Sequence, residues 1–407
     1  MNMNMQKNYL FDSMINGEFL NCEEALKLAG DSHFYQKRTA FILALQYLFV
    51  SFVFQFLMFF LIPPDFNCKS YDAKSFELYC SNEYLKSTCQ TLFFTFSNCA
   101  ILFFSFFSDL KGRKPIMILT YAIGAVALLI AAFAEDIYWF MVSITVAGVG
   151  INPYSSLSFI LIYESSGERF GQLSNVALLA TFGLGQLIFI FISTRFRSYQ
   201  VLMLYFIAIP IIIQIVGFRW IFESPQFLVV KKDFIQAKKV IQMIAKINGR
   251  SVGEFTFVEE GKYEKEIKRR IKSKLDEVKA SDDEMEKPGE ESCAKIGRAS
   301  TLFESKHKNQ NDVVLFHKTP IFERQMLRVY TFLDLAKNKE QFIPMLVLSI
   351  LYFCLYLTYY GALISTPVLG DVYYFNALAQ SSAELFGYVS ANLFIGLLQR
   401  KLFIFHN

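Results

Sequence analysis

The side chains that could do chemistry in this sequence are charged groups placed at the ends of long apolar runs. The densest group is Asp109-Leu110-Lys111-Gly112-Arg113-Lys114, where one carboxylate and three cations lie close together. Two more carboxylates, Glu164 and Glu223, also follow apolar runs. Ion pairs at such positions are partly shielded from water, which makes them stronger than ion pairs on an open surface. The pattern therefore favours electrostatic contacts between helix ends.

The sequence shows no motif typical of phosphate binding, metal binding, catalysis or nucleic-acid binding. It has no glycine-rich phosphate-binding loop, so we do not expect ATP-driven activity. Its seven cysteines are scattered without metal-ligand spacing, so neither a metal site nor a cofactor is expected. There is no catalytic constellation, which argues against an enzyme. The net charge of +4 is attributed to loops, and no nucleic-acid partner is expected.

The elements that must position these charges are long apolar blocks. Hydrophobic residues make up 54% of the chain and aromatic residues 17%, with 45 phenylalanines. Soluble globular proteins contain about 45–50% apolar residues, and distribute them periodically. Here they form uncharged runs close to the ~20 residues that a helix needs to cross a bilayer. The composition predicts an all-α, multi-pass membrane protein.

Eight apolar blocks are long enough to be membrane-spanning helices. They cover residues 39–61, 91–108, 116–134, 138–163, 173–193, 201–217, 342–364 and 377–398. The cationic turn and a long charged loop are placed in the cytosol by the positive-inside rule, together with both chain ends. Asn152-Pro153 in the fourth block leaves two interpretations open, a helix break near the midplane or simple packing with a kink.

The blocks divide the chain into five predicted parts. These are a cytosolic N-terminal segment (1–38), a six-helix half (39–221), a cytosolic charged loop (222–341), two further spans (342–401) and the start of a ninth span (402–407). Short helices are expected around residues 23–29 and 233–247, and residues 276–308 have a disordered composition. In the first outer loop a disulfide is expected, with Cys68–Cys80 preferred among three pairings that include Cys89.

Several motifs in register resemble the organic cation/anion transporter branch of the major facilitator superfamily, which has sugar-porter relatives. The turn Asp109–Lys114 is similar to the signature between the family's second and third helices, although Ser105 replaces a usual glycine. Glu164-Ser165-Ser166-Gly167 resembles the acidic turn that closes the fourth helix. The box Glu223-Ser224-Pro225-Gln226-Phe227-Leu228 resembles the one after the sixth, with Gln226 in place of arginine.

The resemblance implies a major-facilitator-type helical bundle with a complete six-helix N-terminal half and two helices of the second half. It therefore implies a C-terminally truncated member of the family. In the family, charges at the cytosolic helix ends lock two halves together and release them on switching. Carried over by position, the gate residues are Asp109, Gly112, Arg113, Lys114, Glu164, Arg169 and Glu223.

Candidate substrate-binding residues are polar groups inside the spans. Glu384 is a carboxylate within an apolar block, which could attract a cation or carry a proton, or else make a structural hydrogen bond. Tyr359 could hold a cation by its ring face or donate its hydroxyl. The resemblance points to these two most directly. The complete set is Glu384, Tyr359, Asn152, Ser155, Gln186 and Gln55.

The expected function is secondary active or facilitative transport of a small organic ion by alternating access. The plasma membrane is the expected location. The ion is a cation, an anion or a zwitterion. Two alternatives stay open. One is a truncated, transport-inactive protein that acts as an interaction or regulatory subunit, with a partner chain covering the seventh and eighth helices. The other is a sugar-type porter.

Overall fold

The computed structural model describes residues 19–60, 84–196, 198–263, 265–266, 269, 339–365 and 373–405. The expected disulfide between Cys68 and Cys80 and the segment 276–308 lie outside these residues, whereas Cys89 is a buried free thiol. The chain divides into two compact units. The first contains Met1–Lys262 and Thr366–Asn407, and the second contains Tyr263–Ser365.

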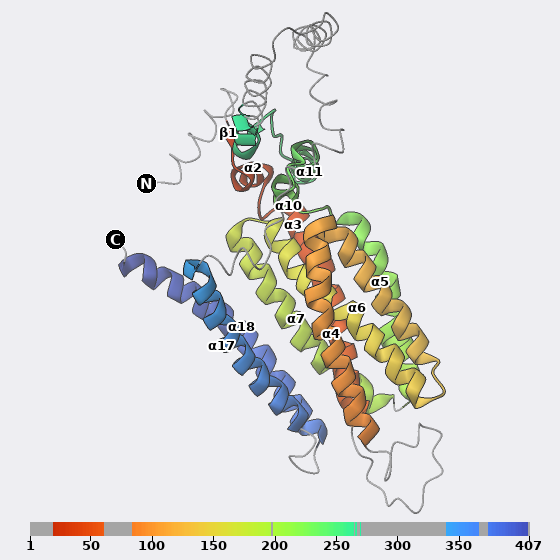
Figure 1. Cartoon of the computed structure of the whole chain (residues 1–407). Helices are drawn as coiled ribbons and strands as arrows, with labels where there is room; N and C mark the ends of the chain where they lie inside the picture. The colour runs from red at the N-terminus through yellow and green to blue at the C-terminus, as the bar shows by residue number, and fades with distance from the viewer. Residues whose placement is uncertain are drawn as a thin grey trace, which may run out of the picture. The chain divides into compact units, whose positions relative to one another are not determined.

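Six membrane-length helical segments form the bundle of the first unit (Figure 1). Five are single α-helices: α3 (Phe34–Phe60), α4 (Tyr84–Lys111), α5 (Arg113–Ala132), α6 (Ile137–Glu164) and α7 (Glu168–Arg195). The sixth is composite and consists of α8 (Tyr199–Val201), the π-helix η2 (Leu202–Ala208), α9 (Ile209–Gln214) and the 3₁₀-helix η3 (Ile215–Trp220). The predicted spans 91–108, 138–163, 173–193 and 201–217 lie within these segments. The span 39–61 is helical as far as Phe60, the last described residue there, and the span 116–134 extends past the end of α5 at Ala132.

Two more long helices follow the charged loop. α17 (Lys339–Ser365) belongs to the second unit, and its apolar side chains are exposed there. α18 (Tyr373–Phe405) belongs to the first unit and packs against α7. α18 continues through Gln399-Arg400-Lys401 to Phe405, the last described residue. These three residues are good helix formers and supply no break. The prediction that a separate, ninth span begins at residue 402 is therefore wrong within the described residues.

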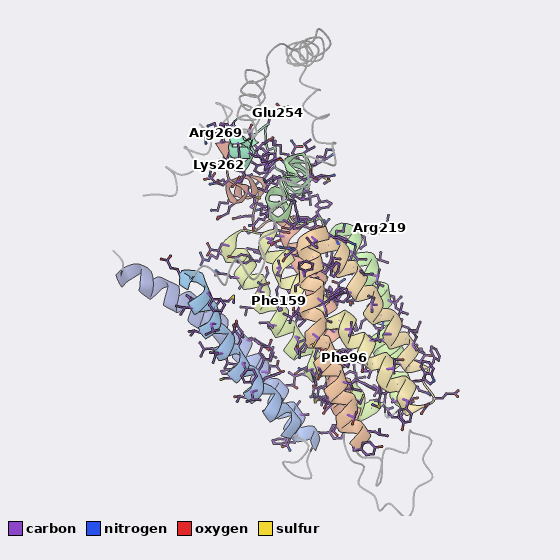
Figure 2. All side chains as sticks on the ribbon, viewed as in Figure 1. Phe96, Phe159, Arg219, Glu254, Lys262 and Arg269 are labelled. Atoms are coloured by element: carbon purple, nitrogen blue, oxygen red, sulfur yellow. The ribbon has the colours of Figure 1, made fainter. Side chains whose placement is uncertain are left out.

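Seven helices in the described part of the chain are long and apolar enough to cross a membrane, namely the six of the bundle and Phe342–Tyr359 within α17. Apolar side chains such as Phe96 and Phe159 lie along the bundle (Figure 2). The labelled charged residue Arg219 lies at one end of it. A long apolar surface with charges at the end is what a bilayer requires of a spanning protein.

Close packing of α5 against α6 depends on small residues. A Cβ atom on Gly150 would lie 2.4 Å from the backbone nitrogen of Gly124 and 2.5 Å from the carbonyl oxygen of Thr120. Small residues allow such approach between helices in lipid. α6 runs unbroken through Pro153, so the interpretation of a helix break at this position is wrong, and packing explains the small residues of this span.

A buried polar network joins four parts of the bundle. The Tyr154 hydroxyl donates to Gln46 Oε1 at 2.5 Å, and Tyr121 donates to Gln214 Oε1 at 2.7 Å. The Gln46 amide donates in turn to the carbonyl of Gln214 at 3.2 Å. Because Gln214 ends α9 where the 3₁₀ segment begins, its carbonyl can be used by a side chain rather than by a regular helical bond.

Beyond the end of the bundle, the chain on either side of the six spans forms a small end module, residues 19–31 and 222–262. It contains β1 (Phe19–Leu20), α2 (Cys22–Ala29), α10 (Pro225–Val230), α11 (Phe234–Ile247) and β2 (Thr256–Phe257). β1 and β2 pair in parallel, and α2 packs on α10 and α11. Burial, helped by nearby carboxylates, raises the pKa of the Cys22 thiol to about 12, so it stays protonated at neutral pH.

The contact at Gly150 generates a stability prediction. Gly150→Ala should destabilise the bundle by about 1–3 kcal/mol, because its methyl group would press on backbone atoms of α5 that cannot move aside alone. The measurement is the apparent Tm of the detergent-solubilised protein. Gly387→Ala in α18 is the control, since nothing lies within 4 Å of that position. Equal Tm values for the two variants would contradict the close approach.

Candidate functional site

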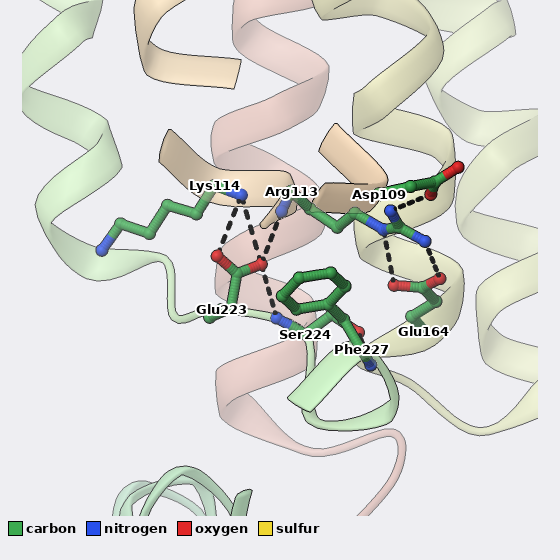
Figure 3. A network of polar contacts seen from close by, with 7 residues as sticks. All are labelled: Asp109, Arg113, Lys114, Glu164, Glu223, Ser224 and Phe227. Carbon is green, nitrogen blue, oxygen red and sulfur yellow. Dashed lines mark hydrogen bonds and ion pairs between the residues drawn. The ribbon is translucent and has the colours of Figure 1, made fainter. Parts of the chain in front are cut away.

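Arg113, the first residue of α5, is the centre of a charged network at the helix ends beside the end module (Figure 3). Its guanidinium donates to Glu164 through two nitrogens, Nη2 to Oε1 at 3.2 Å and Nε to Oε2 at 3.4 Å. The Arg113 and Glu164 side chains are only 13% and 16% exposed. A two-pronged pair with this little exposure is stronger than an ordinary surface ion pair.

A second carboxylate reaches Arg113 from α4. Asp109 pairs with Arg113 Nη1, but the Asp109 side chain is 68% exposed. Water screens this contact more than it screens the pair with Glu164, so its contribution is smaller. Arg113 thus joins the end of α4, the start of α5 and the end of α6.

An aromatic ring completes the surroundings of the guanidinium. Arg113 Cζ lies 5.1 Å from the ring centroid of Phe227, within the range of a cation–π contact. Phe227 belongs to α10, whose N-cap Ser224 accepts a hydrogen bond from the Phe227 amide at 3.1 Å. Sequence reasoning did not select Phe227 for the site, although its position in the box after Glu223 was a usable signal.

Glu223 binds the start of α5 through backbone groups rather than through a cationic side chain. Its Oε1 accepts from the amides of Arg113 at 2.9 Å, Lys114 at 3.2 Å and Ser224 at 3.1 Å. The first amides of a helix lack partners within the helix, and the helix dipole favours a negative charge at this end. The carboxylate therefore caps α5 and ties it to the chain that follows the sixth span.

Gly112 makes this approach possible. Its φ angle of +113° lies in a region that side chains rarely adopt, and a Cβ atom there would lie 2.6 Å from Glu223 Oε2. Glycine is thus required twice at this position, once for the backbone and once for the space that the carboxylate occupies.

The remaining predicted gate residues take part less directly. Lys114 contributes its backbone amide, while its side chain extends away from Glu223 in Figure 3. Arg169 is exposed near the start of α7, and within the described residues no ion pair joins it to Glu164. The structure therefore brings together Asp109, Gly112, Arg113, Glu164 and Glu223, as their positions at helix ends suggested.

The candidate substrate-binding residues are more dispersed. Asn152 on α6 donates to Ser97 Oγ at 3.1 Å on α4, and Ser155 donates to the carbonyl of Ile151 in its own helix. Gln55 and Gln186 are buried in α3 and α7, two helices that pack together. The Asn152–Ser97 contact connects α6 with α4, whereas the Ser155 contact stays within α6.

The last two candidates lie on the helices after the charged loop. Glu384 on α18 accepts a hydrogen bond from the Tyr388 hydroxyl at 2.8 Å. α18 approaches α7 next to it, since a Cβ atom on Gly183 would lie 3.3 Å from Leu385 Cα. Tyr359 belongs to α17 in the second unit.

Comparison with known proteins gives a consistent group of matches. The family model described as Major Facilitator Superfamily matches residues 39–405. The chain is 26% identical to the human steroid transmembrane transporter SLC22A24 over 217 residues, which are 51% of this chain and 38% of that protein. It is 24% identical to solute carrier family 22 member 7 of Rattus norvegicus over 188 residues, 46% of this chain and 35% of that protein.

A further relative has the same range of similarity. Organic anion transporter 3 of Mus musculus is 28% identical over 188 residues, which are 46% of this chain and 35% of that protein. The aligned part is thus a little over a third of each of these relatives. Two of them are named as transporters, which agrees with the expectation that the chain is not an enzyme.

The two constraints on Gly112 can be separated by mutation. Gly112→Ala should cost stability both for its positive φ, about 1–3 kcal/mol, and for the contact with Glu223. Gly249→Ala is the control for a positive φ in open space, because φ there is +69° and nothing lies within 4 Å of the added methyl group. The apparent Tm should therefore fall further for Gly112→Ala.

Removal of the carboxylate provides the internal check on this prediction. In a Glu223→Ala background the contact is gone, so Gly112→Ala should lower Tm by less than it does in the wild-type chain. The same large decrease in both backgrounds would show that Glu223 does not occupy the space beside Gly112.

Proposed function

Because this chain belongs to the major facilitator superfamily, we propose that it carries a small organic ion across a membrane by alternating access. It is an integral, multi-pass membrane protein by its family and its apolar helices. The proposal places it in the plasma membrane, with the end module and both chain ends on the cytosolic side. Relatives named as transporters of steroids and of organic anions support an organic ion as the transported substrate.

The Arg113 network is the observation that carries the proposal. It connects the ends of α4, α5 and α6, all of them within the six-helix half, with α10 of the end module, and the proposal requires one state of the cycle in which these ends move apart. Alternating access needs two discrete packings whose balance a few contacts can shift. Charge pairs at helix ends suit this task because they can break without exposing the apolar core.

The magnitudes are compatible with a lock. A hydrogen bond to a charged group contributes about 1.5–3 kcal/mol, and the two-pronged Arg113–Glu164 pair is reinforced by Asp109 and Phe227. Moving a two-state equilibrium from 1:99 to 99:1 takes about 5.5 kcal/mol. A network of this size can therefore hold one state and still be overcome by differential binding of a substrate.

Substrate binding is assigned to the polar groups inside the spans. Gln55 and Gln186 supply amides within the bundle, and Glu384 supplies a charge on α18 beside α7. An ionisable group inside a membrane span is costly unless it has a partner, so Glu384 is the residue to test for the charge of the substrate. Tyr359 on α17, in the second unit, is a separate candidate that offers a ring face or a hydroxyl.

The function is tested by uptake into liposomes that contain the purified full chain. Separate probes are a labelled quaternary ammonium cation, a steroid sulfate and a hexose, each measured over a range of concentrations. Saturable uptake of either ion supports the proposal. Uptake of the hexose alone would favour the sugar porter, and no saturable uptake would favour an inactive subunit that works through a partner chain.

The lock leads to a prediction for Arg113. Arg113→Gln removes the charge that holds Asp109 and Glu164, so the maximal uptake rate should change by on the order of tenfold. Lys239→Gln is the control, with the same charge change at an exposed position of α11. Equal rates in the two variants would mean that the network does not govern the transport cycle.

Glu384 leads to a prediction about substrate charge. Glu384→Gln keeps a side-chain oxygen that can accept from Tyr388 but removes the negative charge, so cation uptake should be lost or redirected to other substrates. Ser382→Ala, an exposed change on the same helix, is the control. Unchanged cation kinetics in Glu384→Gln would assign Glu384 a structural hydrogen bond instead.

A further inference from the structure

Asn248, at the C-terminal end of α11, binds a distant part of the chain. Its Oδ1 accepts from the amide of Tyr35 at 2.8 Å, at the start of α3. Its Nδ2 lies 2.9 Å from the carbonyl oxygens of both Ala29 and Gly30, and 3.2 Å from Gln36 Oε1. The Asn248 amide has only two N–H groups for these three acceptors, so one N–H group is shared between two acceptors.

These contacts exceed what an ordinary helix cap would need. Asparagine is common at helix ends, where it stabilises its own helix. Here each of the four side-chain contacts of Asn248 goes to residues more than 200 positions earlier in the sequence. Gly30 is shaped to receive it, with φ of +92° and only 3.1 Å between a built Cβ atom and Asn248 Nδ2.

The segment held by Asn248 contacts the turn between α6 and α7 on its other side. The Gly167 amide donates to the carbonyl of Asp31 at 3.1 Å, and Gln36 Nε2 donates to the carbonyl of Ser165 at 3.4 Å. Gln36 is fully buried, so its amide links Asn248 directly to this turn.

The Asp31 carboxylate strengthens the same contact. A Cβ atom on Gly167 would lie 2.4 Å from Asp31 Oδ2, so the carboxylate rests against the N-cap of the 28-residue helix α7. A negative charge is favoured at this end of a helix. We call Asp31, Gln36 and Asn248 the clasp.

The turn held by the clasp also carries a residue of the charged network. Ser165 is the C-cap of α6, and Glu164 directly precedes it. A displacement of the turn would therefore change the distance between Glu164 and Arg113, which is 3.2 Å between Oε1 and Nη2.

We propose that Asn248 is a positioning residue that, through Gln36 and Asp31, holds the α6–α7 turn where Glu164 pairs with Arg113. The position of the end module is thereby coupled to the charged network. Only the effect of this coupling on transport rests on the proposed function, whereas the positioning itself is a property of the folded chain.

Hydrogen–deuterium exchange on the full chain in lipid nanodiscs tests the positioning. Asn248→Asp loses the Nδ2 donors and turns a carboxylate toward three oxygen acceptors, and Gln242→Glu is the matched control at an exposed position of α11. The expected result is exchange of amides 163–171 that is on the order of tenfold faster in Asn248→Asp alone. Residues 124–132 of α5 should be unchanged in both.

A different distribution of the effect would overturn the proposal. If exchange accelerates only within residues 29–36 and 244–250, Asn248 fastens the end module and does not position the turn.

A second variant tests the clasp from its other end, and it remains informative if Asn248→Asp does not fold. Gly167→Ala fits its backbone, since φ is −65°, but its methyl group would displace Asp31. Amides of 33–38 and 244–250 should then exchange faster. Gly253→Ala, with nothing within 4 Å, is the control. Unchanged exchange at 244–250 would contradict a connection from the turn to Asn248.

Uptake by the same variants separates the clasp from the proposed function. If the wild-type chain transports none of the probes, the proposed function fails and the exchange result still decides the clasp. If it transports, Asn248→Asp combined with Arg113→Gln should change uptake no further than Arg113→Gln alone, because both act through one ion pair. Multiplied effects in the double variant would overturn the coupling.

Discussion

A guanidinium at the edge of the bundle needs partners, because a charge withdrawn from water without them is costly. Arg113 obtains them from three surrounding elements, with carboxylates from α4 and α6 and an aromatic face from α10. The turn between α4 and α5, the end of α6 and the chain after the sixth span must therefore meet at one point. The arrangement of this end of the bundle follows from that requirement.

Two helix starts in the bundle are closed by carboxylates that come from outside it. Glu223, which follows the sixth span in the sequence, caps α5. Asp31, which precedes the first span, lies against the start of α7. In each case a glycine, Gly112 or Gly167, leaves the space that the carboxylate occupies. The unpaired amides and the dipole of a long helix thus attach the end module to the bundle at two places.

Within the apolar part of the bundle, small residues and buried amides replace the hydrophobic effect as the source of specificity. Contact at Gly150 brings α5 and α6 together, and the Gln46–Tyr154 and Tyr121–Gln214 hydrogen bonds set their relation to α3 and α9. Lipid tails are as apolar as leucine, so shape and hydrogen bonds decide which helix faces meet. These contacts make the bundle a firm support for the charges at its end.

The sequence by itself determined the helices and the family, because the length of an apolar block and the order of a short motif are local properties. It also placed Arg113, Glu164 and Glu223 at helix ends. Only the tertiary structure decided that Glu223 binds backbone amides, that Phe227 lies against Arg113 and that Asn248 reaches Gln36. It likewise separated Arg169 from the network and carried α18 to Phe405. Such partners are far apart in the chain, so spacing holds no information about them, and only the packing of the helices brings them within hydrogen-bond distance.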